Sequence, residues 1–342
     1  MTQNEWREEE EVQGEEEEPM GDRELTRLLQ RARRKTIIRN VIISVISAVV
    51  VLFGALVANN TLLGASKEQA EREIRTWKEI TGPNVFLTEA WHNTGFLTGE
   101  LEYEMYKDIE GIPVIWGREG AAYRLFGDYD KQGELRVPIE LPDPEMAGAH
   151  FTYKRPYNNQ SGQREMLFYH PQVAYGQYLN DVPHLQEMEK DTLVEMGLSF
   201  DKAYSVQQVQ DMLPQGVHAV WYWVDTYSAG EVKTMSHSKP HPELARQVYG
   251  FQAHSRDDLP AAGTYREDHF LQAIQEGLEQ EGKYYIEYKR LFDLLRHDKP
   301  APTVEDVRLL GVVATGTAQD LQQLAGQTYC KAAVLGATAD EY

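Results

Sequence analysis

The sequence predicts an α+β protein with a single transmembrane helix, then a strand-rich region, then a mixed-sheet α/β sandwich with two strand-helix-strand units. Three observations lead to this fold class. One uncharged apolar run lies near the N-terminus. Short runs of β-branched and aromatic residues, separated by Gly, Pro and Asp, follow it and are typical of antiparallel strands. In the last part of the chain, strand-like and helix-like segments alternate.

The apolar run predicts one membrane crossing. Residues 41–58 carry no charge, and Ile37 and Ile38 extend the run, which gives a transmembrane segment at 37–58. About 20 apolar residues cross a hydrocarbon core of roughly 30 Å as a helix. The bases that precede the run are Arg31, Arg33, Arg34, Lys35 and Arg39, and only Lys67 follows within ten residues. Basic residues beside a span stay in the cytoplasm, so we expect a cytoplasmic N-terminus and an extracytoplasmic C-terminus in the cell membrane. A cleaved signal peptide is the alternative, but its N-terminal region would be short and basic.

Charge is distributed unevenly along the 342 residues, whose net charge is -20. Residues 1–24 carry -9, residues 25–40 carry +6, and the remaining outer part carries -17. A chain without a basic surplus cannot neutralise phosphates, so we expect no direct nucleic-acid partner. The outer part has no basic surface for anionic lipid, and we expect it to be held at the membrane by its anchor. The single cysteine, Cys330, excludes an intramolecular disulfide.

The segment 1–36 is predicted to be short, acidic and partly disordered. Its first 21 residues are rich in glutamate and offer little apolar surface to bury. Asp22 can begin a helix that continues into the membrane. We choose Leu25, Arg27, Leu28 and Leu29 on this helix as candidate contacts with a cytoplasmic partner. The simpler interpretation is that this stripe only extends the transmembrane helix towards the cytoplasm.

Residues 59–145 are predicted to hold a stalk helix and a strand-rich domain. The helical composition of residues 66–80 ends at Gly82 and Pro83, which stop helices. Strands are expected at 99–106, 112–116, 122–126 and 135–141. Residues 128–133 imitate half of a calcium loop, but the acid required at its end is misplaced. A hairpin turn is the better interpretation, and residues 141–144 are a candidate boundary.

Residues 146–338 are predicted to form the second outer domain. The expected strands lie at 193–200, 217–224, 307–315 and 328–335, and the expected helices begin at Ser205 and span 268–280, 284–295 and 317–325. Ser205 and Gln208 have the spacing of a capping box. The order strand, helix, strand occurs twice, and such units normally pair their strands in parallel with a right-handed crossover. We therefore expect a mixed sheet with helices on one face.

The sequence contains none of the common catalytic motifs, so we predict no catalytic residue and no enzymatic activity. His237 and His241 have a metal-ligand spacing, but Pro240 would break the helix that aligns them. We therefore predict no metal site and no cofactor. Trp221 and Trp223 share one face of a strand, where they either pack in the core under the helices or line a ligand groove.

Two parts of the chain carry a resemblance to a known family. The first part is RARRKTIIRNVIISVISAVVVLFGALVANN, the stalk and the strands that follow it, and the second is most specific in LSFDKAY and GVVATGT. In these segments the chain resembles the bacterial sigma factor regulator family, whose members are membrane anti-sigma factors. The resemblance implies that the chain holds an extracytoplasmic-function sigma factor at the membrane until an envelope signal releases it. The His-x-x-x-Cys-x-x-Cys signature of the common zinc-binding anti-sigma fold is missing from the sequence.

This resemblance implies a non-catalytic regulator whose outer part receives an envelope cue and whose inner segment acts on a partner. That partner is either the sigma factor itself or a separate anti-sigma membrane subunit. Release could be conformational, or it could follow proteolytic clipping of the outer part. Two other classes remain open: an envelope-binding or assembly protein with no role in transcription, and a tethered enzyme of an unrecognised type.

Overall fold

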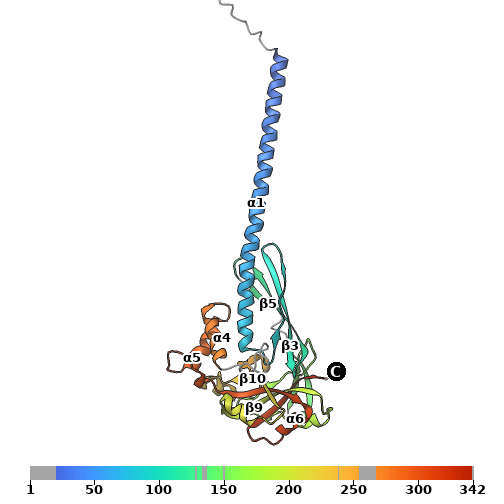
Figure 1. The fold of residues 1–342 in the computed structure, drawn as a ribbon, viewed down its shortest axis with the longest axis vertical. Helices are drawn as coiled ribbons and strands as arrows, with labels where there is room; N and C mark the ends of the chain where they lie inside the picture. Colours follow the sequence, from blue (N-terminus) through green and yellow to red (C-terminus); the bar gives the residue numbers. More distant parts are fainter. Residues whose placement is uncertain are drawn as a thin grey trace, which may run out of the picture. The chain divides into compact units, whose positions relative to one another are not determined.

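The computed structural model describes residues 21–127, 129–132, 137–148, 151–237, 239–253 and 267–340 (Figure 1). The chain divides into two compact units, Met1–Asn59 and Asn60–Tyr342. In the first unit, the described residues from Asp22 onward belong to helix α1 (Asp22–Ile80). Among the described residues, α1 is the one helix long and apolar enough to cross a membrane, as predicted. The acidic stretch 1–20 lies outside the described residues.

The second unit begins with the last turns of α1, which pack on an antiparallel sheet. The strands of this sheet are β1 (Phe86–Leu87), β2 (Trp91–Thr94), β3 (Thr98–Ile109), β4 (Ile112–Arg124) and β5 (Tyr129–Gln132). Their order is β1-β3-β4-β5, with β2 also paired to β3. Alternate residues such as Leu101 and Tyr103 face α1, where they form a core with Ala70 and Ile74. The stalk helix ends at Ile80, as its sequence predicted.

Three details of this region differ from the prediction. The strands expected at 112–116 and 122–126 are one continuous strand, β4. The hairpin turn expected at 128–133 comes earlier, because Tyr129–Gln132 already forms β5. Residues 128 and 133–136 lie outside the described part. Strand β6 (Ile139–Gly148) runs through residues 141–144 and pairs with β7 (Phe151–Tyr157).

A second five-stranded sheet forms the centre of the C-terminal part. Its strands are β9 (Leu193–Tyr204), β10 (His218–Val224), β12 (Gly250–Gln252), β13 (Leu309–Thr317) and β14 (Cys330–Ala339), in the order β12-β10-β13-β9-β14. The two predicted units are β9-α2-β10 and β13-α6-β14, with α2 (Val206–Met212) and α6 (Ala318–Leu321). Ser205 forms the predicted capping box with Gln208.

The pairing in this sheet corrects one expectation. The strands of each unit run parallel to each other, but a strand of the other unit lies between them, so every pair of adjacent strands is antiparallel. This interleaving is the split β-α-β arrangement, extended by β12 at one edge. The sequence predicts each unit well, but it does not tell which strand lies between the members of a unit. The α+β class is confirmed, and the expectation of directly paired parallel strands is wrong.

Helices cover one face of this sheet. Side chains of α2, α6, α4 (Glu267–Glu279) and α5 (Tyr285–Arg296) share a core with Met196, Leu198 and Tyr222. The opposite face carries Trp221 and Trp223, which pack against β8 (Leu167–Phe168) and a short 3-10 helix, η2 (Ala245–Gln247). The remaining described elements are β11 (Glu243–Leu244), α3 (Ala229–His237) and the 3-10 helices η1 (Val182–Gln186), η3 (Val304–Asp306) and η4 (Gln322–Leu324).

Candidate functional site

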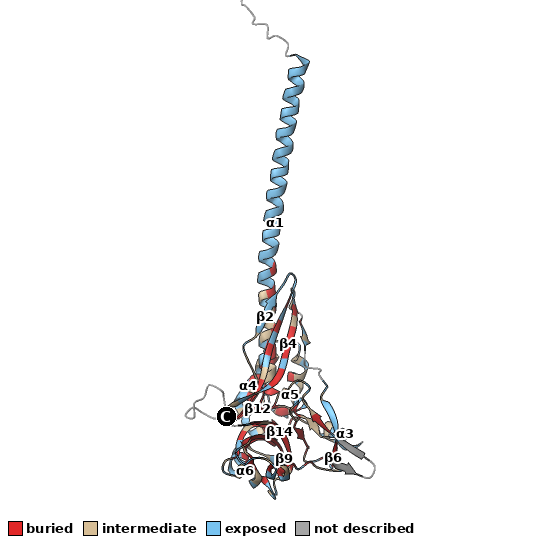
Figure 2. Ribbon diagram, turned by 90° about the vertical axis from the view of Figure 1, so that its right-hand side faces the viewer, coloured by how far each residue is buried: buried red, intermediate tan, exposed pale blue. Residues whose placement is uncertain are grey.

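The four residues chosen as cytoplasmic contacts lie on the first turns of α1. Leu25, Leu28 and Leu29 are 45%, 48% and 62% exposed, and Arg27 is exposed as well. Figure 2 shows this part of α1 as exposed throughout. Leu25 and Leu28, and likewise Leu25 and Leu29, are one helical turn apart, so they lie on the same side of the helix. The three leucines therefore offer a small apolar stripe that no other described residue of the unit covers.

Trp221 and Trp223, the candidates for a ligand groove, are both 0% exposed. They lie on the sheet face opposite the helices, and Phe168 approaches each, at ring-centroid distances of 6.5 Å and 5.2 Å. Tyr222, between them, faces the helices instead. In the described residues the two indoles thus have a packing role, on the face that the sequence did not predict. None of the described cavities is lined by either tryptophan.

A buried ion pair joins the two sheets of the second unit. Lys107 on β3 is 1% exposed and its Nζ lies 2.6 Å from Oε2 of Glu195 on β9, which is 0% exposed. Asn84 donates from Nδ2 to Oε1 of Glu195 at 2.9 Å, and the Ala337 amide donates to Oε2 at 3.2 Å. The Lys107 ammonium also lies 4.1 Å from the ring centre of Trp116, a cation–π distance. Each charge is therefore compensated, as burial requires.

A cavity of about 160 Å³ opens beside this ion pair. Its walls come from the end of α1, from β3 and β4, and from the segment after β7, and they include Trp77, Lys78, Lys107, Glu119 and Glu165. Burial alone would raise the pKa of Glu119, but the ammonium groups of Lys78 and Lys131 hold it below its usual value. Burial raises the pKa of Glu165. The cavity thus has charged side chains in a partly apolar lining and lies where three parts of the second unit meet.

The end of α1 is held by the turn between α4 and α5. Trp77 stacks on Tyr284 with ring centroids 4.1 Å apart and meets Tyr249 and Tyr288 edge-on. Glu73, which is 3% exposed, accepts hydrogen bonds from the Lys283 amide at 2.9 Å and from the Tyr129 hydroxyl at 3.0 Å. We call this set of contacts the stalk clamp. It connects α1 to the hairpin of α4 and α5, the two helices that pack on the second sheet.

Gly282 permits the closest approach within the stalk clamp. A Cβ at this position would collide with the carboxylate of Glu73. A side chain there would either displace the Glu73 carboxylate from its hydrogen bonds with the Lys283 amide and the Tyr129 hydroxyl or move the turn away from α1. Gln280 adds a hydrogen bond from Nε2 to Oγ1 of Thr76 at 3.0 Å. The turn therefore approaches α1 through backbone and polar contacts as well as through aromatic rings.

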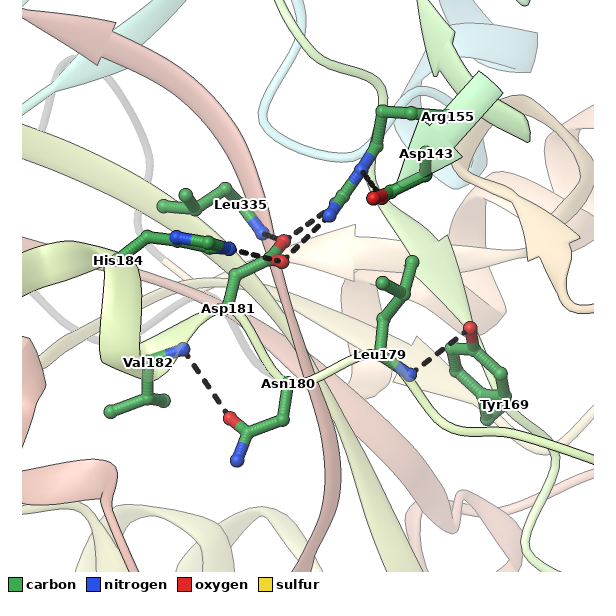
Figure 3. A network of polar contacts seen from close by, with 9 residues as sticks. All are labelled: Asp143, Arg155, Tyr169, Leu179, Asn180, Asp181, Val182, His184 and Leu335. Atoms are coloured by element: carbon green, nitrogen blue, oxygen red, sulfur yellow. Dashed lines mark hydrogen bonds and ion pairs between the residues drawn. The ribbon is translucent and has the colours of Figure 1, made fainter. Parts of the chain in front are cut away.

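A second buried network fixes the β6–β7 hairpin to the edge of the second sheet (Figure 3). Arg155 on β7 donates from Nη1 and Nη2 to the two carboxylate oxygens of Asp181 at 2.6 Å and 2.7 Å. Its Nε donates to Asp143 at 3.2 Å, and the Leu335 amide on β14 donates to Asp181 at 2.8 Å. Figure 3 also shows His184 pointing at Asp181, at 4.0 Å. The network covers an otherwise open edge strand, β14.

The ion pair, the stalk clamp and the Arg155 network join separate elements of the second unit, and none of the three places a reactive group in an arrangement typical of catalysis. Among the described residues no cluster of three His, Cys, Asp or Glu side chains could hold a metal ion. His237 ends α3, and the thiol of Cys330 has its pKa raised by burial to about 12. Sequence analysis missed Lys107 and Glu195. The signal that could have found them is a charged residue within an otherwise apolar strand, such as the glutamate in LVEMGLSF.

Two family models match separate regions of the chain. The family model for the sigma factor regulator N-terminal region matches residues 26–114, and that for the sigma factor regulator C-terminal region matches residues 185–337. The first match includes the end of α1 and Lys107, and the second includes Glu195 and the α4–α5 hairpin. The stalk clamp and the buried ion pair thus join the two matched regions. No curated protein and no solved structure matches the chain.

Proposed function

The chain belongs to the sigma factor regulator family, a membrane-anchored class of regulators, and from this we propose that it restrains an extracytoplasmic-function sigma factor in response to an envelope signal. We place the acidic N-terminal segment in the cytoplasm, because five bases precede the apolar run of α1 and one lysine follows it closely. Residues from about 60 onward then lie outside the cell and receive the signal. The chain acts by binding and not by catalysis.

One observation supports this proposal more than any other. Helix α1 carries the candidate membrane span, the exposed leucine stripe at its start and the stalk clamp at its end. A change in the outer domain that loosens or tightens the stalk clamp therefore acts on the same helix that bears the proposed partner contacts. Coupling of this kind shifts a population between two states, by as much as the signal discriminates between them.

We propose that Leu25, Leu28 and Leu29, with Arg27, contact the cytoplasmic partner. Their side chains are exposed in this structure, and leucines one turn apart suit a groove or a partner helix. The partner is the sigma factor itself or a small membrane subunit that in turn binds it. An acidic segment that folds on a basic partner would lose a few kcal/mol of its interaction energy to ordering.

A pulldown from native membranes in mild detergent tests this function. The full-length protein should recover a sigma factor, and a Leu25→Ser, Leu28→Ser, Leu29→Ser variant should lose it. The matched control carries Ile286→Ser, which removes a side chain that is 83% exposed on α5. Recovery of a second membrane protein in place of the sigma factor would identify a two-subunit device. If intact protein recovers neither, the regulator proposal fails and the outer domain is better explained as an envelope-binding module.

A further inference from the structure

The first sheet ends in two turns that expose apolar side chains. Phe96 and Leu97 lie in the turn between β2 and β3 and are 64% and 46% exposed. Phe126 lies in the turn between β4 and β5 and is 88% exposed. The Leu125 amide donates to the Leu97 carbonyl at 3.2 Å, so the two turns are neighbours. We call Phe96, Leu97 and Phe126 the apolar tip.

The apolar tip is held beside α1. The Gly127 amide donates to Oγ of Ser66 at 3.0 Å, which fixes the second turn against the helix within the same unit. In Figure 1 the turn that leads into β5 lies beside α1. Leu97 has a φ of 66°, a left-handed conformation that is rare and costly for a side chain of this size. The fold thus keeps a leucine with a strained backbone in an exposed turn, and contact with water does not offset the free-energy cost of that strain.

The chain leading to Ser66 is short and uncharged. Ser66 is eight residues after Ala58, the end of the apolar run, and no charged residue occurs from Asn40 to Ser66. Eight helical residues measure about 12 Å, so Ser66 lies a few ångströms beyond a headgroup layer that is about 5–8 Å thick on each side of the bilayer core. The two turns themselves, NTGFLT and LFG, carry no charge either. A lipid surface is therefore the apolar medium that the anchor keeps within reach of the apolar tip.

We propose that the apolar tip inserts into the outer lipid interface of the membrane that α1 spans. Moving phenylalanine and leucine side chains from water into this interface lowers the free energy, and aromatic residues concentrate there. The contact does not need basic residues, so the -17 charge of the outer part does not oppose it on neutral lipid. Insertion would hold the first sheet, and with it the end of α1, at a fixed level above the bilayer. This inference rests on the membrane anchoring and not on the identity of the cytoplasmic partner.

Labelling of the full-length protein in vesicles tests the proposal. Phe126→Cys and, as the matched exposed control, Ile286→Cys are made in a Cys330→Ala background and labelled with the environment-sensitive fluorophore NBD. Each protein is reconstituted into phosphatidylcholine vesicles, with and without phosphatidylcholine that carries a shallow nitroxide. We expect several-fold brighter, blue-shifted emission at position 126 than at position 286, and quenching by the nitroxide lipid at position 126 only.

Two results would overturn the inference. Equal, water-like emission at both positions would show that the tip stays in solvent. Shielded emission at position 126 that the nitroxide lipid does not quench would show that protein covers the tip, either a second copy or another subunit. At high salt, where charge repulsion is screened, vesicles containing phosphatidylglycerol should give the same result as neutral vesicles, because the contact is apolar. Loss of the sigma-factor pulldown would leave this measurement unaffected, so the two proposals fail independently.

Discussion

Lys107 and Glu195 are the two buried charges that join the regions matched by separate family models. They are 1% and 0% exposed, so neither can recover hydration when its partner is removed. Glu195→Gln leaves the Lys107 ammonium uncompensated and should lower the free energy of unfolding by about 3–5 kcal/mol. The double variant Lys107→Met, Glu195→Gln should recover much of that loss. Urea unfolding of the full-length protein in detergent, followed by tryptophan fluorescence, measures both.

An exposed ion pair provides the control for this prediction. Arg118 and Glu104 are 59% and 52% exposed, and their atoms lie 3.2 Å apart. Arg118→Gln should change the free energy of unfolding by less than about 1 kcal/mol, because solvent screens such pairs. If Glu195→Gln costs no more than Arg118→Gln, the buried pair does not hold the two regions together.

We expect His170 to make the stability of the second unit depend on pH. Its side chain is 1% exposed, and burial, together with the nearby Lys331 charge, lowers its pKa from about 6.5 to about 4. Between these values the unfolded chain binds a proton that the folded chain does not, so stability rises with pH in this window. We expect this contribution to the free energy of unfolding to be fully present above about pH 6.5 and to fall by about 3 kcal/mol towards pH 4.

The measurement is the urea midpoint of the wild-type protein and two variants at several pH values in that window. His170→Gln should flatten the pH dependence, whereas His241→Gln, at an exposed position, should leave it as in the wild type. Parallel curves for wild type and His170→Gln would assign the acid sensitivity to other groups.

At the scale of elements, the hairpin of α4 and α5 contacts α1 through a turn in which Gly282 lies against the Glu73 carboxylate. A methyl group from Gly282→Ala would either displace that carboxylate from its hydrogen bonds with the Lys283 amide and the Tyr129 hydroxyl or move the turn away from Trp77. We expect a loss of about 1–3 kcal/mol from overpacking. Hydrogen exchange should become faster in α5 (Tyr285–Arg296) and stay unchanged in the central strands β9 and β13.

Gly230→Ala is the matched control for this change. Gly230 lies in α3, and the nearest atom to a Cβ there would be Oγ of Ser228 at 3.8 Å. Alanine is the better helix former, so this variant should be neutral or slightly stabilising. Equal exchange in α5 for both variants would mean that the stalk clamp does not depend on the approach of Gly282.

The elements of the C-terminal part could be predicted closely from the sequence, because each signal is local. The capping box at Ser205 and the apolar faces of the predicted 268–280 and 284–295 helices all lie within one segment, and the structure has helices there. Strand order depends on contacts between distant segments, which composition and periodicity do not encode. The Trp pair illustrates this limit: alternation correctly predicted that Trp221 and Trp223 share a face, but the expectation that the helices cover this face is wrong, because β8 and η2 cover it.

At the scale of the whole molecule, the chain combines two functions that a membrane regulator needs. One unit contains the candidate span and the exposed leucine stripe, and the other contains two sheets joined by buried polar contacts. The sequence could predict the candidate membrane span, because hydropathy and charge are read directly from composition, whereas the partner segment stays a prediction. It could not predict the buried ion pair, the stalk clamp or the Arg155–Asp181 network, because each joins residues far apart in the chain.

The central claim is that the inner segment restrains a sigma factor. The most direct test is transcription from the sigma-dependent promoters that the pulldown partner controls. Cells carrying the chain with residues 1–36 replaced by a neutral linker of equal length, and with α1 otherwise intact, are compared with cells carrying the full chain. We predict that promoter activity rises to the level of cells that lack the protein. Unchanged promoter activity, with the variant present in the membrane at normal abundance, would contradict the account.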